Sequence, residues 1–166
     1  MSNSVQYAKS LLVWALLAPG HEFMVLIIKS ILENEGRDNR RAYPLARVQA
    51  YQPFDGREDS ILFGELSVHI SAMRNRANQP KVEDEDKQEA LFDRPADARE
   101  YELEFPNGKH FPVLMLSYVG PQHERLFYAS MHGRRLVVTQ SKLYSFEDRS
   151  TAPVEFFTCM LLSCPL

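Results

Sequence analysis

The sequence predicts an α+β fold, in which helices pack against a mixed β-sheet. Apolar residues recur at helical spacing in the first third of the chain. In the second half, apolar residues either alternate with polar ones or form short continuous runs, as they do in strands. With 45% hydrophobic and 25% charged residues, the 166-residue chain has the composition of a globular protein with a substantial core.

Two helices are expected in the N-terminal third. The first covers residues 4–18 and is interrupted by Pro19-Gly20. The second carries an apolar stripe from Phe23 to Leu32 and ends at Gly36, a residue type favoured just after a helix. The apolar run before Pro19 is too short to span a bilayer and lacks the spacing of a signal-peptide cleavage site, so no integral membrane segment is expected. We therefore expect an N-terminal helical hairpin and connector (residues 1–59) packed on a core domain (residues 60–166).

The middle of the chain predicts two strands and a helix. The first strand lies near residues 47–51, between Pro44 and Pro53. The second covers residues 61–70, where apolar or small residues occupy alternate positions. These alternating residues are Leu62, Gly64, Leu66, Val68 and Ile70. The charged, proline-free segment 81–91 predicts a solvated helix.

The remainder is expected to be rich in strands. Residues 101–105 alternate in polarity, and Asn107-Gly108 then predicts a turn. The nearly continuous apolar run at 111–119 predicts a strand buried on both faces. The last predicted elements are a strand over residues 125–129, a helix over 136–144, where apolar residues recur at helical spacing, and a strand over 153–162.

Five short segments, taken in order, resemble a known family. They are 65–70 (ELSVHI), 78–81 (NQPK), 111–114 (FPVL), 126–135 (LFYASMHGRR) and 151–154 (TAPV). They resemble the opening strand and N-x-Q-P-R-like stretch, the P-I-x-V…G-x-x-R core and the closing T-x-P-V strand of the ParB/sulfiredoxin superfamily. The resemblance covers residues 60–162 and implies a ParB/sulfiredoxin-like mixed sheet with packed helices.

The resemblance is to a stand-alone member of that superfamily. No cysteine lies near the G-x-x-R-like turn, and neither an E-N-x-x-R box nor a helix-turn-helix domain follows it, so sulfiredoxin and partition-protein chemistry are not expected. Plasmid fertility-inhibition factors of the oncogenic-suppression type are members of this kind. Resemblance to them implies a bacterial, cytoplasmic protein that blocks conjugative DNA transfer through a type IV secretion system. It also implies ATPase and DNase activity, with ATP and Mg²⁺ as cofactors.

The implied partners are a nucleotide, DNA and a type IV secretion or coupling component. A peripheral association with the inner membrane stays open. The first alternative is a catalytically inactive module that inhibits a transfer or secretion component by docking on it, for which the apolar N-terminal hairpin is the relevant feature. The second is a small-molecule kinase.

The predicted phosphate site is the turn from His132 to Arg135. If a helix begins there, its free N–H groups and its dipole attract an anion. Arg134 and Arg135 are placed to clamp phosphate oxygens, and the resemblance gives them a catalytic role as well. His132 is a candidate general acid, and Ser130 and Gly133 are candidate phosphate contacts. The alternative is a tight hairpin with glycine at its bend and both arginines in water.

Further candidates lie outside this turn. Glu124 is a candidate water-activating base. Glu83 and Asp86, within an acidic run, are candidate Mg²⁺ ligands. The alternative is that this acidic run is the solvated face of a helix. A formal net charge of −3 gives no global attraction for nucleic acid, so DNA contact requires a local basic patch. The candidate DNA contacts are Arg74, Arg76 and Lys81, of which Lys81 is also a candidate phosphate contact; a plain polar loop is the alternative.

Overall fold

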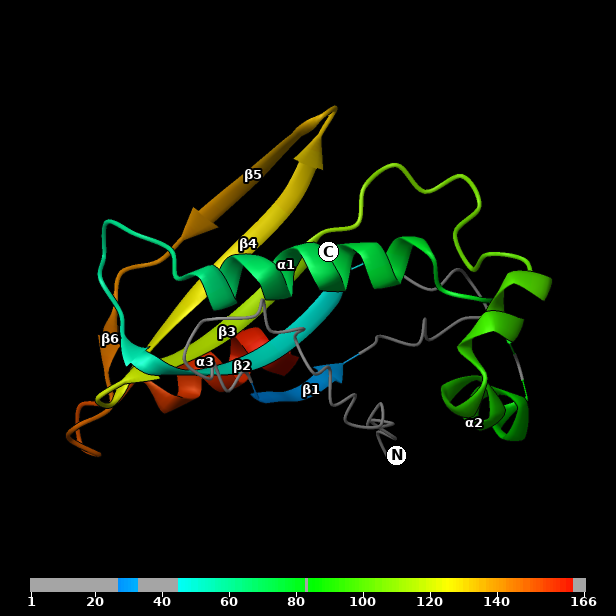
Figure 1. Cartoon of the computed structure of the whole chain (residues 1–166). Helices are drawn as coiled ribbons and strands as arrows, with labels where there is room; N and C mark the ends of the chain where they lie inside the picture. The colour runs from blue at the N-terminus through cyan, green and yellow to red at the C-terminus, as the bar shows by residue number, and fades with distance from the viewer. Residues whose placement is uncertain (1–26, 33–44, 83, 163–166) are drawn as a thin grey trace, which may run out of the picture.

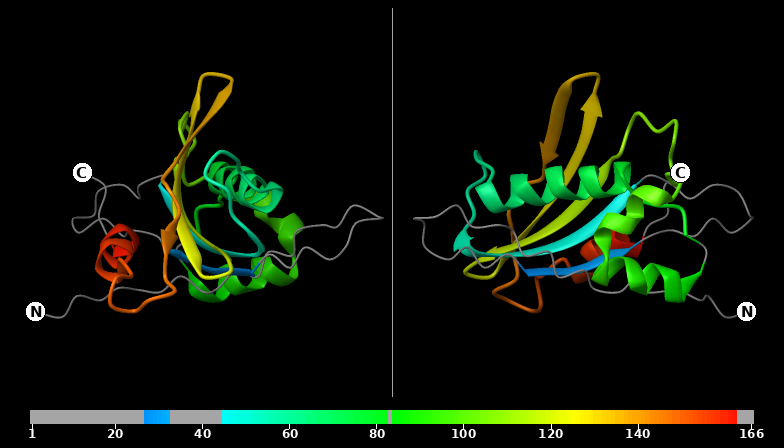
Figure 2. Two further views of the ribbon diagram at one scale, coloured as in Figure 1. Left: turned by 90° about the vertical axis from the view of Figure 1, so that its left-hand side faces the viewer. Right: turned by 45° about the vertical axis from the view of Figure 1, so that its right-hand side comes forward.

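The computed structural model describes residues 27–32, 45–82 and 84–162 of the chain. It shows a twisted mixed sheet with helices on both faces (Figures 1 and 2), which confirms the predicted α+β class. The strand order is β1-β2-β3-β4-β5, and β6 pairs with one end of β4. Strands β2 and β3 are parallel, and the other pairs are antiparallel. The strands are β1 (Ile27–Leu32), β2 (Ala46–Asp55), β3 (Val113–Gly120), β4 (His123–His132), β5 (Arg135–Gln140) and β6 (Tyr144–Ser145).

Helix α1 (Phe63–Ala77) lies across one face of the sheet in the connection from β2 to β3. The strand predicted over residues 61–70 is therefore wrong. The buried positions of α1 recur every three to four residues, as a helix requires. They are Gly64, Glu65, Val68, His69, Ala72, Met73 and Arg76. Because three of these seven are charged or titratable, the buried stripe does not stand out as an apolar helical pattern.

The core beneath α1 is formed by side chains of α1, β2, β3 and β4. On β3 and β4 the alternate positions Val113, Met115, Phe127 and Ala129 belong to this cluster. The intervening residues face the other side of the sheet, because successive side chains of a strand point to opposite faces. The strand predictions for residues 47–51, 111–119 and 125–129 are confirmed by β2, β3 and β4.

Helix α3 (Val154–Leu162) covers part of the opposite face, where Phe157 packs with Leu116 and Leu126. Figure 2 shows α3 and α1 on the two sides of the sheet. The strand predicted over residues 153–162 is thus wrong. A continuous apolar run of this length is equally compatible with a buried helix. In α3 the Phe157 ring packs against the rings of Tyr144 and Phe146.

A helical excursion separates α1 from β3. It consists of α2 (Glu85–Asp93) and a short 3-10 helix, η1 (Pro95–Glu100). The Asp84 carboxylate accepts hydrogen bonds from the backbone N–H groups of Asp86 and Lys87, which caps α2. The helix predicted over residues 81–91 is confirmed with shifted ends. The strand predicted over residues 101–105 is wrong. In this segment the structure describes an isolated bridge between Leu103 and Pro80 rather than a strand.

The N-terminal predictions are tested only in part. The first predicted helix, over residues 4–18, lies outside the described residues. Of the second, residues 27–32 form strand β1, so a helix there is wrong; β-branched Ile27, Ile28 and Ile31 suit the strand. Strands β1 and β2 precede the predicted boundary at residue 59, yet they belong to the same sheet as the strands after it. None of the helices in the described part of the chain has the length and apolar character needed to cross a membrane.

Candidate functional site

The predicted phosphate turn is the tip of a hairpin formed by β4 and β5. His132 and Arg135 are the last paired residues, so Gly133 and Arg134 form a two-residue loop. Gly133 has a φ of 63°, the positive value that the first loop position of such hairpins requires. The helix predicted over residues 136–144 is wrong. Its apparent helical spacing overlaps a strand pattern in which β-branched Val137, Val138 and Thr139 favour β5.

Without a helix after it, the turn has no free helix N–H groups and no helix dipole to attract phosphate. The arrangement matches the alternative considered for this segment, a hairpin with glycine at its bend and both arginines exposed. Ser130 is half-buried farther down β4, whereas His132, Gly133, Arg134 and Arg135 are all exposed. The exposed side chains of His132, Arg134 and Arg135 are therefore the charged or titratable groups at the turn that an anion can contact.

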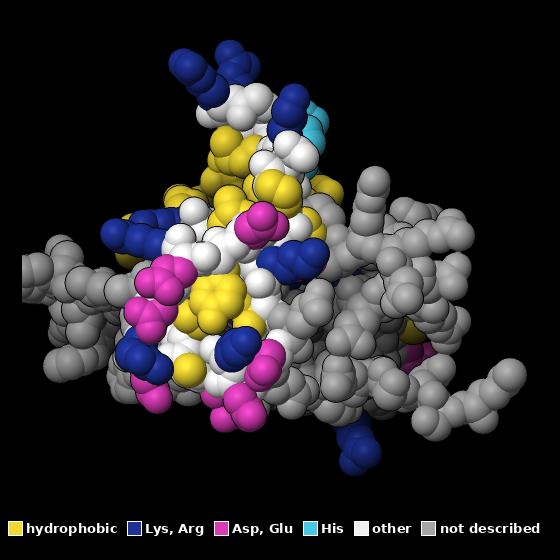
Figure 3. All heavy atoms as spheres, turned by 90° about the vertical axis from the view of Figure 1, so that its right-hand side faces the viewer, with side chains coloured by type: hydrophobic (Ala, Val, Ile, Leu, Met, Phe, Trp, Pro, Cys, Tyr) yellow, Lys and Arg dark blue, Asp and Glu magenta, His cyan; other side chains and the backbone are white. Residues whose placement is uncertain are grey.

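Positive charge is concentrated at this tip. Between Phe127 and Gln140 the hairpin has two arginines and one histidine, and no acidic residue. The ring of His110 donates through Nδ1 to the Met131 carbonyl at 2.9 Å, which brings the loop carrying Lys109 beside the hairpin. Figure 3 shows Lys, Arg and His side chains at the projecting end, above the acidic side chains of the body. The tip is thus basic in a chain whose net charge is negative.

One face of the hairpin is anchored and the other is open. Met131, Leu136 and Val138 turn toward α1 and pack against the core. The opposite positions carry polar and aromatic side chains, and Tyr128 and Val137 are 47% and 44% exposed. We call this set the open face of the hairpin. It consists of Tyr128, Ser130 and His132 on β4 and Arg135, Val137 and Thr139 on β5.

A second polar cluster is enclosed beneath α1 and centres on an ion pair. Arg125 donates to both carboxylate oxygens of Glu65, from Nε at 2.9 Å and from Nη2 at 2.5 Å, and neither side chain has any exposed surface. The Ser117 hydroxyl and the Leu62 backbone N–H also donate to this carboxylate. The remaining nitrogen of Arg125, Nη1, donates to the carbonyls of Arg57 and Ser60. The ion pair therefore joins α1, the preceding loop and two strands.

His69 and Gln52 complete this buried cluster. His69 Nδ1 donates to the Glu65 carbonyl at 2.7 Å, and desolvation lowers the pKa of the ring. The amide of Gln52 lies directly over Gly64, where a Cβ atom would be 2.2 Å from Gln52 Oε1. Because the cluster is sealed from solvent, a substrate cannot reach it, and its role is to hold α1 on the sheet. None of these residues was a predicted site residue. The sequence feature that could have indicated them is the presence of polar residues inside otherwise apolar segments.

Glu124 lies on the other face of the sheet and is 2% exposed. The hydroxyl of Tyr118 is hydrogen-bonded to its carboxyl group, while Oε1 has no partner in the described residues. Burial raises the pKa of Glu124 to about 8, and burial together with the Glu124 charge raises the pKa of Tyr118 to about 12. Glu124 and His132 are at opposite ends of β4, about 26 Å apart at the rise of a strand. The structure does not bring this candidate base to the arginines.

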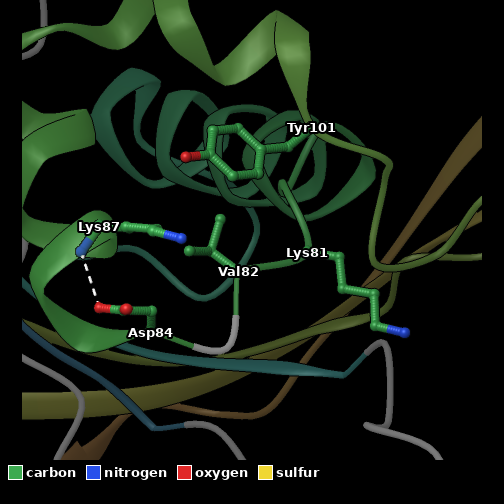
Figure 4. Close-up of a pocket in the computed structure, with 5 residues that line it drawn as sticks. All are labelled: Lys81, Val82, Asp84, Lys87 and Tyr101. Carbon is green, nitrogen blue, oxygen red and sulfur yellow. Dashed lines mark hydrogen bonds between the residues drawn. The ribbon is translucent and has the colours of Figure 1, made fainter.

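Lys81 borders an open pocket of about 400 Å³ near the start of α2, together with Val82, Asp84, Lys87 and Tyr101. In Figure 4 the ammonium group of Lys81 points away from the hydroxyl of Tyr101. The Asp84 carboxylate is already used to cap α2. This pocket lies on the helical excursion, and nothing places it next to the hairpin.

The remaining candidates are also dispersed. Arg76 is 4% exposed, donates to Gln79 Oε1 and lies 4.7 Å from the Phe105 ring centre, so its guanidinium offers no surface to a nucleic acid. Arg74 is exposed on the last turn of α1. Glu83 lies outside the described residues, and Asp86 is exposed on α2. Within the described ranges, no three His, Cys, Asp or Glu side chains are grouped so that they could hold a metal ion.

The chain matches none of the family models, curated proteins or solved structures with which it was compared. The resemblance to the ParB/sulfiredoxin superfamily thus stays a prediction, and the geometry of the hairpin is the observation on which a function can rest.

Proposed function

We propose that the protein binds DNA through the β4–β5 hairpin. The observation that carries this proposal is the charge of the hairpin, which is basic at its tip and free of acidic residues from Phe127 to Gln140, the part in which β4 and β5 pair. In a chain with a formal net charge of −3, such a segment attracts a polyanion locally although the whole molecule does not.

The shape of the hairpin suits a duplex. The major groove of B-DNA, about 12 Å wide, accepts a two-stranded β-ribbon. The hairpin projects from the body of the sheet, and packing of its other face against the core fixes its direction (Figure 1). Arg134 at the tip can reach phosphate oxygens, while Arg135 and the hydroxyls of the open face can reach base edges.

The enzymatic part of the sequence prediction has less support. Glu124 lies at the far end of β4 from the arginines, and Asp86 lies on a separate helical excursion. ATP hydrolysis, DNA cleavage and a role for Mg²⁺ stay predictions from the family resemblance. A protein that occupies DNA is compatible with the predicted block of conjugative transfer. Docking on a type IV secretion or coupling component, without catalysis, stays the alternative.

Replacing both hairpin arginines is expected to abolish most of the affinity for DNA. In the variant Arg134→Ala/Arg135→Ala, duplex binding measured by fluorescence anisotropy in about 0.1 M salt should weaken by roughly tenfold or more, because two phosphate or base contacts are lost. The slope of log K against log salt concentration should also fall by about 2 if both contacts are to phosphate.

The matched control removes two exposed arginines elsewhere, in the variant Arg99→Ala/Arg149→Ala. The two variants have the same net charge, so a general charge effect weakens both equally. Equal loss in both, or unchanged binding in the hairpin variant, contradicts the proposal.

A further inference from the structure

The outer edge of β5 has no strand beside it in the described part of the chain. β5 is last in the strand order, and β6 pairs with β4 rather than with β5. An unpaired edge exposes a row of backbone N–H and C=O groups that can pair with another strand. Within its six residues, RLVVTQ, this edge has one charged residue, Arg135, at its tip end. It contains no proline, and its register with β4 is continuous from His132↔Arg135 to Phe127↔Gln140.

The two ends of this edge carry opposite charge. Arg134 and Arg135 are exposed at the tip. At the other end lies the loop with Glu58 and Asp59, because the Gln140 amide donates to the Glu58 carbonyl and the Leu143 N–H donates to Glu58 Oε1. Lys142 is near this end too, but its ammonium group lies 5.1 Å from the Tyr144 ring centre, toward β6. Asp59 is exposed beside Gln140.

An open pocket of about 290 Å³ adjoins the acidic end. Apolar side chains of Ile61, Leu66 and Val138 line it, together with Asp59, Ser60 and Gln140. The pocket is on the α1 side of the sheet, the side to which Leu136 of β5 also points. In strand addition, backbone hydrogen bonds give affinity and such pockets receive alternate side chains of the added strand.

We propose that two copies of this chain pair through β5, antiparallel and about a twofold axis. Antiparallel pairing brings the basic tip of each β5 to the acidic end of the other, so Arg134, in the loop at the tip of one copy, lies near Asp59 of the second. The same pairing carries Leu136 of each copy toward the pocket of the other. A twofold contact requires one surface that is complementary to itself, and this edge has opposite charges at its two ends and an apolar pocket on the side to which Leu136 points.

The test is the mass in solution, measured by sedimentation equilibrium from about 1 to 200 µM. The wild-type chain should reach twice its monomer mass of 19.1 kDa. Asp59→Arg should weaken dimerisation at least tenfold, because it places like charges opposite each other. Adding Arg134→Asp to that variant should restore the dimer, and Asp93→Arg, at an exposed aspartate on α2, should leave it unchanged.

Hydrogen exchange of the β5 amides that point away from β4 locates the contact. Protection should rise with protein concentration in the wild type and not in Asp59→Arg. A wild type that stays monomeric at 200 µM, or a charge swap that fails to restore dimers, overturns the proposal. So does protection of these outward-pointing amides that is independent of concentration in a monomer, which shows that another segment of the same chain covers the edge. Asp59→Arg keeps both hairpin arginines, so loss of the dimer and loss of DNA binding are measured separately.

Discussion

Replacing Arg125 with methionine is expected to lower the free energy of unfolding by about 3–5 kcal/mol, the cost typical of breaking a buried ion pair on one side. The substitution leaves the Glu65 carboxylate sealed in the core without its counter-ion. It also removes the donor for the carbonyls of Arg57 and Ser60. Since domains of this size are stable by roughly 5–15 kcal/mol, urea denaturation at pH 7 should show a large fall in midpoint or no folded baseline.

The double variant Glu65→Leu/Arg125→Met distinguishes the loss of an ion pair from the creation of an unpaired charge. It should be more stable than Arg125→Met alone, because no charge then remains in the core. Arg135→Met, at an exposed arginine, is the matched control and should change stability by less than about 0.5 kcal/mol. If Arg125→Met lowers the free energy of unfolding by less than about 1 kcal/mol, the Glu65–Arg125 ion pair does not hold α1 on the sheet.

The sequence pattern predicts a strand correctly where most of the strand's apolar residues are buried in the sheet. The continuous run of β3 is buried on both faces, so its pattern is visible without knowledge of its neighbours. Strand β2 and the first part of β4 were located for the same reason, and Gly133 was correctly placed at a turn.

The elements that were missed depend on contacts between distant parts of the chain. The carboxylate of Glu65 is paired with a residue 60 positions later, so nothing local indicates that it faces the core of a helix. β5 is fixed by pairing with β4, which overrides a spacing of apolar residues that also fits a helix. This error carried over to the site, because the helix expected after the turn was the basis for phosphate binding there. The arginines were identified, but the element that presents them was not.

Stability is also expected to depend on the protonation of Glu124. Burial raises the pKa of its carboxyl group from 4.5 to about 8, so the folded state binds this proton more tightly than the unfolded state. The stabilisation from this group is therefore complete below about pH 4.5 and is lost as pH rises through 8. At 1.36 kcal/mol for each unit of pKa shift, the contribution across this range is about 5 kcal/mol at most.

Glu124→Gln isolates this effect, because a glutamine imitates the protonated acid and keeps an oxygen that accepts from the Tyr118 hydroxyl. The difference in unfolding free energy between Glu124→Gln and the wild type should be small near pH 5 and grow in favour of the variant up to pH 9. His69 has its pKa lowered by burial and so contributes an opposite slope at acidic pH, but it does so in both proteins and cancels in the difference. Glu147→Gln, at an exposed glutamate, is the control and should give a difference that does not vary with pH.

The same protonation bears on the predicted role of Glu124 as a base. A carboxyl group that keeps its proton up to about pH 8 cannot accept one from water at neutral pH, and this one has almost no exposed surface through which water could reach it. Glu124→Gln should therefore change stability and leave duplex binding by the hairpin unaltered at pH 7. A variant that loses DNA affinity while its stability curve matches the wild type would place Glu124 in the binding site and contradict a purely structural role.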